Sequence, residues 1–168
     1  LRRCDKDNIK EAYAPEIPDN GLWRAVKNRL YKAAAGRLLN TETAKSVLFV
    51  CTGNTCRSPM AEALFNISGK NAVAMSAGLA ASGASPASPN AIAAAREYGA
   101  DLKNHISVQI TAEMIENADL ILTMTKAHKM YLPQSDKIKT LSEFAGAGGD
   151  VSDPYGGDIE VYRKCAAQ

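Results

Sequence analysis

The sequence is poor in cysteine, histidine and aromatic residues, and each shortage excludes a class of protein. Its four cysteines are too few and too unevenly spaced for a disulfide framework, and together with two histidines they show no zinc-binding spacing. We therefore expect reduced thiols in a reducing, cytoplasmic location, with no metal and no cofactor. Aromatic residues do not alternate with basic ones as a base-stacking surface requires, so we expect no nucleic-acid partner.

Long apolar runs are also missing. The apolar run Val47–Val50 is far shorter than the roughly 20 residues that a helix needs to cross a bilayer, and nothing resembles a secretory signal. We expect a soluble protein without a membrane partner. The 168 residues, 46% hydrophobic and 23% charged, are enough for one domain of ordinary size and an additional segment.

The small net charge of +2 hides an uneven distribution along the chain. Residues 1–46 carry ten Lys and Arg against six Asp and Glu, whereas residues 47–168 carry ten against twelve. Within the basic part, residues 20–39 have apolar side chains at helical spacing, which predicts an amphipathic basic helix. Its cationic face could bind an acidic partner, but a solvated face opposite a packed apolar stripe is the favoured interpretation.

These differences predict where the domain begins. Residues 40–46 are polar and without pattern, as in a linker. We expect residues 1–45 to form an N-terminal basic helical extension and linker, and residues 46–168 to form the main domain. Because the sequence opens on Leu1 rather than methionine, we treat residue 1 as an arbitrary start.

From Val47 onward, short apolar runs alternate with helical stretches, which predicts an α/β fold. Runs that are apolar throughout are typical of parallel strands buried on both faces, with helices on both sides of a doubly wound sheet. Ser88 and Thr111 are expected to cap helices, and Gly99 suits a helix end. The expected strands are 47–50, 72–75, 120–124 and 138–141, and the clearest helices are 59–68 and 89–98.

One segment, Val47–Glu62, has the form of an anion-binding site, because a buried strand leads through a tight loop into a helix. The loop from Cys51 to Arg57 can turn successive N–H groups toward a phosphate. A helix N-terminus and a nearby arginine stabilise a cysteine thiolate, so Cys51 is the candidate nucleophile. The planar guanidinium of Arg57 can bind two phosphate oxygens, and the Ser58 hydroxyl can donate to the Cys51 sulfur.

This loop resembles the signature of the low-molecular-weight protein tyrosine phosphatase family, whose members are flavodoxin-like. Ser76-Ala77-Gly78, the run 119–124 and Asp153-Pro154-Tyr155-Gly156-Gly157 match the family in order and type, so the resemblance covers nearly all of 46–168. It implies a four-stranded, doubly wound parallel sheet with helices on both faces. The implied activity is that of a phosphoprotein phosphatase that forms a cysteinyl-phosphate intermediate on phosphorylated protein substrates.

The resemblance also assigns a role to Asp153, which would otherwise be taken for a turn residue. In the family, the aspartate of this Asp-Pro pair protonates the leaving group and then activates water, which is a task for a carboxylate held near the reacting atoms. Tyr155, next along, is expected to form an aromatic wall of the substrate site.

Several loop residues are expected to bind the substrate or support the loop: Thr52, Gly53, Asn54, Thr55, Cys56 and Ser58. Asn54 is expected to adopt a left-handed turn and to tie the loop together by side-chain hydrogen bonds. Cys56 lies close enough to Cys51 in sequence for a reversible disulfide that would protect the nucleophile from over-oxidation.

The residue at position 55 bears on the substrate. Tyrosine-directed relatives commonly have a bulky aliphatic residue there, and Thr55 resembles the protein-arginine-phosphatase branch. A hydroxyl offers a polar partner to a guanidinium leaving group, which favours phosphoarginine over phosphotyrosine. Arsenate reduction ranks third, since no cysteine lies between Cys56 and Cys165.

Four further expectations remain. Residues 13–35 resemble the C-terminal end of a threonylcarbamoyl-adenylate synthase, which raises the possibility of a fused or adjacent synthase domain upstream. A non-catalytic anion-binding or interaction fragment of such a fusion remains the alternative from another class. We expect the last helix to be shortened, since the resemblance implies a longer one, and we expect His105 and His128 to be surface or capping residues.

Overall fold

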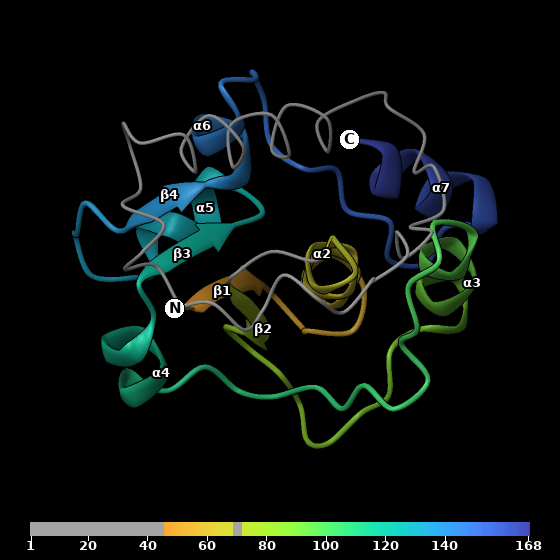
Figure 1. Cartoon of the computed structure of the whole chain (residues 1–168), viewed down its shortest axis with the longest axis horizontal. Helices are drawn as coiled ribbons and strands as arrows, with labels where there is room; N and C mark the ends of the chain where they lie inside the picture. Colours follow the sequence, from red (N-terminus) through yellow and green to blue (C-terminus); the bar gives the residue numbers. More distant parts are fainter. Residues whose placement is uncertain (1–45, 69–71) are drawn as a thin grey trace, which may run out of the picture.

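The computed structural model describes residues 46–68 and 72–168, which form a four-stranded sheet with helices around it (Figure 1). The strand order is β2-β1-β3-β4, and every neighbouring pair is parallel. The predicted extension and linker, residues 1–45, lie outside the described residues. The strands are β1 (Ser46–Cys51), β2 (Val73–Gly78), β3 (Leu120–Thr123) and β4 (Ile138–Thr140).

Parallel pairing explains the near-continuous apolar runs of the sequence, because both faces of the sheet are covered. In β1, Val47 and Phe49 belong to one buried cluster, while Leu48 and Val50 belong to a second cluster on the opposite face. All four are at most 2% exposed. The predicted α/β class and two-sided core are therefore confirmed.

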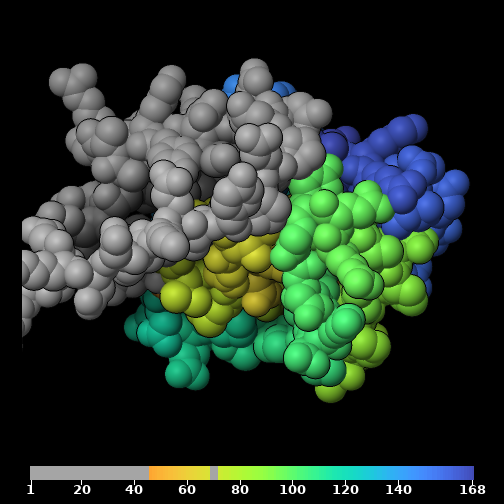
Figure 2. Space-filling view, turned by 45° about the vertical axis from the view of Figure 1, so that its right-hand side comes forward, coloured from red at the N-terminus to blue at the C-terminus, as the bar shows by residue number. Residues whose placement is uncertain are grey.

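The two clusters contain different helices. One face is covered by α2, α3, α6 and α7, and α4 contributes Met114 and Ile115 to the other. Helices α3 and α7 contact each other, and Figure 2 shows their segments, green and blue, side by side on the surface. The helices are α2 (Arg57–Asn66), α3 (Pro89–Glu97), α4 (Ala112–Asn117), α5 (Lys126–Met130), α6 (Leu141–Ala145) and α7 (Ile159–Ala167).

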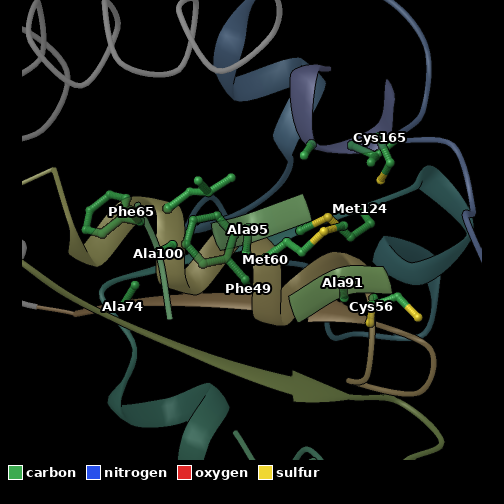
Figure 3. Packing of buried hydrophobic residues seen from close by; sticks show 14 of the residues in the cluster. Phe49, Cys56, Met60, Phe65, Ala74, Ala91, Ala95, Ala100, Met124 and Cys165 are labelled. Atoms are coloured by element: carbon green, nitrogen blue, oxygen red, sulfur yellow. The ribbon is translucent and has the colours of Figure 1, made fainter. Parts of the chain in front are cut away.

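Helix α2 packs against β1 and β2 and fixes the direction in which the loop between β1 and α2 leaves the sheet. The rings of Phe49 and Phe65 meet edge to face at 5.9 Å between centroids, and Met60 packs in the same cluster (Figure 3). Burying such side chains contributes about 1.5 to 3 kcal/mol each. This packing anchors the far end of the helix whose first residue is Arg57.

The expected helix ends are present. Ser88 accepts a hydrogen bond from the Ala91 N–H at the start of α3, and Thr111 accepts one from the Met114 N–H at the start of α4. Gly99 follows α3 with a φ of +83°, which suits glycine. The short helices α5 and α6 were not predicted, since five residues give too little periodicity to recognise.

The topology places the β1–α2 loop where a ligand site is expected. Strand β1 lies between β2, which follows it in sequence, and β3, so the strand order reverses at the carboxyl end of β1. Cys51 is the last residue of that strand. No helix among the described residues has the length and apolar character needed to cross a membrane.

Candidate active site

The backbone of the loop that follows β1 is held open by hydrogen bonds to its carbonyl groups from outside. The Cys51 and Thr52 carbonyls accept the Leu79 and Ala80 N–H groups at 2.9 Å, and the Thr55 carbonyl accepts the Ser88 N–H at 2.8 Å. In a trans peptide the next N–H points opposite to the carbonyl. The outward carbonyls therefore turn the following N–H groups toward the inside of the loop, where they can bind an anion.

Asn54 is the internal anchor of this loop. It is fully buried, and its φ of +54° is the left-handed conformation expected from the sequence. Its Nδ2 donates to Ser58 Oγ at 2.9 Å and to Ser76 Oγ at 2.7 Å, and its Oδ1 accepts the Val108 N–H at 2.8 Å. The prediction that Asn54 ties the loop together is borne out by this geometry.

Gly78 explains why the sequence has Ser-Ala-Gly at the end of β2. A Cβ at this position would lie 2.6 Å from the Thr52 carbonyl oxygen and 3.1 Å from the Asn54 nitrogen. Only glycine allows the β2 backbone to approach the loop this closely. Ser76 continues the network, because its hydroxyl donates to Glu62 on α2.

The sulfur of Cys51 lies at the centre of these contacts. The Asn54 N–H donates to Cys51 Sγ at 3.3 Å, and Ser58 Oγ lies 3.0 Å from the same sulfur. Since Ser58 Oγ already accepts from Asn54 Nδ2, its own hydrogen is free to donate to the sulfur. Two hydrogen-bond donors thus converge on the sulfur.

Arg57 and Asp153 face each other across the site, although they are 96 residues apart in sequence. Arg57 Nη2 donates to Asp153 Oδ2 at 2.7 Å, and the Asp153 Oδ1 accepts the Tyr155 N–H at 3.2 Å. The two side chains differ in exposure, 6% for the arginine and 55% for the aspartate. The guanidinium is therefore held by its surroundings, and the carboxylate lies at the mouth of the site.

These groups surround a cleft of about 410 Å³. All the predicted site residues line it except Asn54 and Ser58, which lie behind the loop and support it. Ser82 and Ser85, from the loop between β2 and α3, also line the cleft and were not predicted, because nothing local distinguishes them from other loop serines. Within the described residues no three His, Cys, Asp or Glu side chains gather as a metal site.

Cys56 lines the cleft, but its side chain is engaged on the other side. Its sulfur lies 3.3 Å from the hydroxyl of Tyr162 on α7 and donates to Ser88 Oγ at 3.4 Å. Burial, together with the Cys56 contact, raises the pKa of Tyr162 to about 12, so this phenol stays protonated. Cys51 and Cys56 are both free thiols, and their reversible disulfide stays a prediction.

The interpretation of His128 as a surface or capping residue is wrong. Its side chain is buried, with Nε2 2.9 Å from Thr52 Oγ1 and Nδ1 2.9 Å from Thr125 Oγ1. His105 also faces the loop, since its Nε2 donates to the Asn54 carbonyl at 2.8 Å. Neither histidine belongs to a triad or metal motif, and the sequence carries no local signal for histidines that hold a loop from outside.

Comparisons with known proteins agree with this geometry. The family model "Low molecular weight phosphotyrosine protein phosphatase" matches residues 46–168, and the model "Threonylcarbamoyl-AMP synthase, C-terminal domain" matches residues 1–35. A protein-arginine-phosphatase of Bacillus subtilis is 46% identical over 128 residues, which cover 70% of this chain and 85% of that protein.

Solved structures show the same fold. A low molecular weight protein tyrosine phosphatase from T. tengcongensis matches with a TM-score of 0.70 at 47% identity, over 73% of this chain and 90% of that one. A YwlE arginine phosphatase, solved as a cysteine-to-serine mutant with a phosphorylated active-site serine, matches with a TM-score of 0.67 at 44% identity, over 72% and 86%. The cysteine loop, the fold and these relatives together show that this chain is a hydrolase belonging to the low molecular weight phosphotyrosine protein phosphatase family.

Proposed function

We propose that this phosphatase hydrolyses phosphoarginine in proteins, with Cys51 as nucleophile, Arg57 as phosphate clamp and Asp153 as general acid and base. The observation that carries the assignment of roles is the position of the Cys51 sulfur. Two hydrogen-bond donors, the Asn54 N–H and the Ser58 hydroxyl, contact this sulfur. Cys51 lines the same cleft as Arg57 and Asp153, which form an ion pair there.

In the first step, the Cys51 thiolate attacks phosphorus, and the bond from phosphorus to the leaving nitrogen breaks. The leaving guanidine takes a proton from Asp153, while the guanidinium of Arg57 binds two phosphoryl oxygens. In the second step, Asp153 accepts a proton from water, whose oxygen attacks phosphorus. The sulfur–phosphorus bond breaks, inorganic phosphate is released, and Ser58 stabilises the departing thiolate by its hydroxyl hydrogen.

The polar lining of the cleft supports phosphoarginine as the substrate. Thr55, Ser82 and Ser85 add hydroxyl groups near the place where the leaving group would lie, and Asp153 adds a carboxylate. A guanidinium group needs such acceptors when it loses contact with water. Relatives whose names state arginine phosphatase activity support the same choice.

Tyr155 keeps phosphotyrosine as the second candidate. Tyr155 lines the cleft and is 80% exposed, so its ring is available to stack on an aromatic leaving group. A guanidinium plane also stacks on an aromatic face, so Tyr155 alone does not choose between the two substrates.

The deciding experiment measures kcat/KM of the purified chain on matched phosphoarginine and phosphotyrosine peptides. We expect Thr55→Ile to shift the ratio of the two values toward phosphotyrosine by roughly tenfold, the effect of about 1.4 kcal/mol at one polar contact. Thr55→Val separates loss of the hydroxyl from added volume, and Thr55→Ser is the control that keeps the hydroxyl. An unchanged ratio in Thr55→Ile and Thr55→Val would contradict the role of Thr55.

A simpler measurement tests the enzymatic assignment itself. Turnover of p-nitrophenyl phosphate by the wild-type chain, lost in Cys51→Ser, is the expected result. Complete absence of turnover would favour the alternative of a non-catalytic anion-binding fragment. Because the nucleophile requires a reduced thiol, and Cys51, Cys56 and Cys165 are all free, a reducing compartment such as the cytoplasm is part of the proposal.

We also propose that residues 46–168 form the phosphatase domain and that residues 1–45 are an extension with its linker. The family match over 46–168 supports this boundary. A synthase segment upstream is a further part of the proposal and rests on the match to residues 1–35 alone. Limited proteolysis of the whole chain is expected to cut first within residues 36–45, and first cuts inside 72–168 would contradict the boundary.

A further inference from the structure

His128 is a buried side chain beside the active site that the proposed mechanism does not use. It lies on α5, the short helix that follows β3, and β3 is the neighbour of β1 in the sheet. The His128 ring connects α5 to Thr52, the residue directly after the nucleophile. The side chain is 7% exposed although imidazole is polar, so its contacts have to satisfy both ring nitrogens.

The contacts of Thr125 are compatible with a ring that accepts a hydrogen bond at Nδ1. Thr125 Oγ1 caps α5 and accepts the His128 backbone N–H at 3.1 Å. Its hydroxyl hydrogen can then be donated to His128 Nδ1, 2.9 Å away. With Nδ1 as the acceptor, the ring proton is on Nε2 and is donated to Thr52 Oγ1, also at 2.9 Å.

The surroundings keep the ring in its neutral form, which this arrangement requires. Burial lowers the pKa of His128, and the Arg57 guanidinium lowers it further, against the opposing effects of Asp153 and Asp150. Lys126 and Lys129 are the other cationic side chains on α5. A neutral ring has a single N–H, which is all that a chain from Thr125 through His128 to Thr52 requires.

This chain ends at Thr52, which lines the cleft together with Cys51 and Arg57. Because its oxygen accepts the proton of Nε2, its own hydrogen is available to a phosphoryl oxygen in the cleft. We propose that His128 is a positioning residue, which holds Thr52 so that the Thr52 hydroxyl donates to the phosphoryl group. This inference rests on the proposed phosphatase mechanism and adds a donor to it.

A double-mutant cycle tests the proposal in the whole chain, with kcat/KM for p-nitrophenyl phosphate as the readout. Thr52→Val removes the hydroxyl without changing shape, and His128→Phe removes both ring contacts but keeps a ring. We expect each variant to lose about tenfold, and the double variant to lose no more than either one. A loss in the double variant equal to the product of the two single losses would overturn the coupling.

Rescue separates positioning from a general structural role. His128→Gln keeps an amide donor that can reach Thr52, and Thr52→Ser keeps the hydroxyl, so both are expected to stay within about threefold of wild type. Thr111→Val is the matched control, because it removes an N-cap hydroxyl from α4 and is expected to leave kcat/KM within about twofold. If His128→Gln loses as much as His128→Phe, the ring is needed for packing and the proposal fails.

Two further measurements distinguish failure of this inference from misfolding of a variant and from failure of the proposed function. If His128→Phe does not fold, ¹⁵N NMR of the His128 ring tests the proposed tautomer instead. We expect a protonated Nε2 and an unprotonated Nδ1 in wild type. In Thr52→Val we expect faster exchange of the Nε2 proton with solvent. Protonation at Nδ1 instead would overturn the assignment. If wild type turns over substrate through Cys51 while Thr52→Val and His128→Phe match it within twofold, only this inference fails. If wild type shows no turnover, the proposed function fails first.

Discussion

The two sides of the cleft are built differently. On the nucleophile side, Asn54 and Ser58 are fully buried and joined to each other and to β2 by side-chain hydrogen bonds. On the acid side, the side chain of Asp153 is 55% exposed and that of Tyr155 is 80% exposed. Pro154, between them, is buried, and Val151, just before Asp153, belongs to the core cluster.

This difference separates the two tasks of the site. A loop that binds a phosphoryl group through backbone N–H groups has to be fixed before the substrate arrives, since its donors stabilise charge without reorganisation. An acid that must follow a leaving group, and later a water molecule, benefits from an exposed position with few contacts. We therefore expect changes on the fixed side to affect stability and chemistry together, and changes on the exposed side to affect chemistry alone.

The largest expected effect is at the centre of the fixed side. Cys51→Ser should reduce turnover by about four orders of magnitude or more, because a serine hydroxyl is a far weaker nucleophile than a thiolate. Phosphate or vanadate should still bind, since the backbone donors and Arg57 remain. Measured kcat and inhibition constants check both parts, and activity near that of wild type would remove Cys51 from the mechanism.

The next effect tests the exposed side. Asp153→Asn should slow phenyl phosphate, a poor leaving-group substrate, by about 10² to 10³, and p-nitrophenyl phosphate by less than about tenfold, because only the former needs a proton in the transition state. The free energy of unfolding should hardly change, since an ion pair to a half-exposed carboxylate contributes only about 0 to 1 kcal/mol. Equal losses on both substrates would remove Asp153 from the acid role.

The contrast between the two sides also decides what could be predicted from the sequence. The fixed side is local: strand, loop and helix follow one another from Val47 to Glu62, so the anion-binding geometry could be expected from order and residue type alone. The contacts that hold it from outside are not local. His128 and His105 lie 76 and 51 residues from the loop positions they contact, and only the folded sheet brings them there.

The exposed side could not be predicted from the residues by themselves. Asp153 next to Pro154 is typical of a turn, and its place opposite Arg57 followed from a family resemblance rather than from spacing. The contacts of Cys56 could not be predicted from its position in the sequence either. Its sequence position suggested a partner in Cys51, whereas its sulfur contacts Tyr162, 106 residues away.

One variant from each side of the cleft tests whether the two sides differ in their contribution to stability. Asn54→Ala should destabilise the protein by about 2 to 3 kcal/mol, because it leaves buried partners at Ser76 and Val108 without their bonds and puts alanine in a left-handed conformation. Tyr155→Leu should change stability by no more than about 0.5 kcal/mol while raising KM. Chemical denaturation of both variants gives the two values, and similar losses would contradict the division.

The smallest effect concerns whether the fixed side depends on pH through His128. Burial lowers the pKa of His128 in the folded protein below its usual value of about 6.5, so the unfolded chain binds this proton at a higher pH than the folded protein. The free energy of unfolding should therefore fall as pH falls below about 6.5, and the fall should end below the folded-state pKa. At pH 7 and above this group contributes no pH dependence, because the ring is neutral in both states.

His128→Gln has no titrating ring at this position and should lack that part of the decline. Denaturation curves of wild type and His128→Gln at intervals from about pH 7.5 to pH 5 give the difference, which should grow in favour of the variant as pH falls. A difference that stays constant with pH would show that the histidine titrates alike in the folded and unfolded chain. The contact between His128 and Thr52 would then give the fixed side no pH dependence that sets it apart from the exposed loop of Asp153.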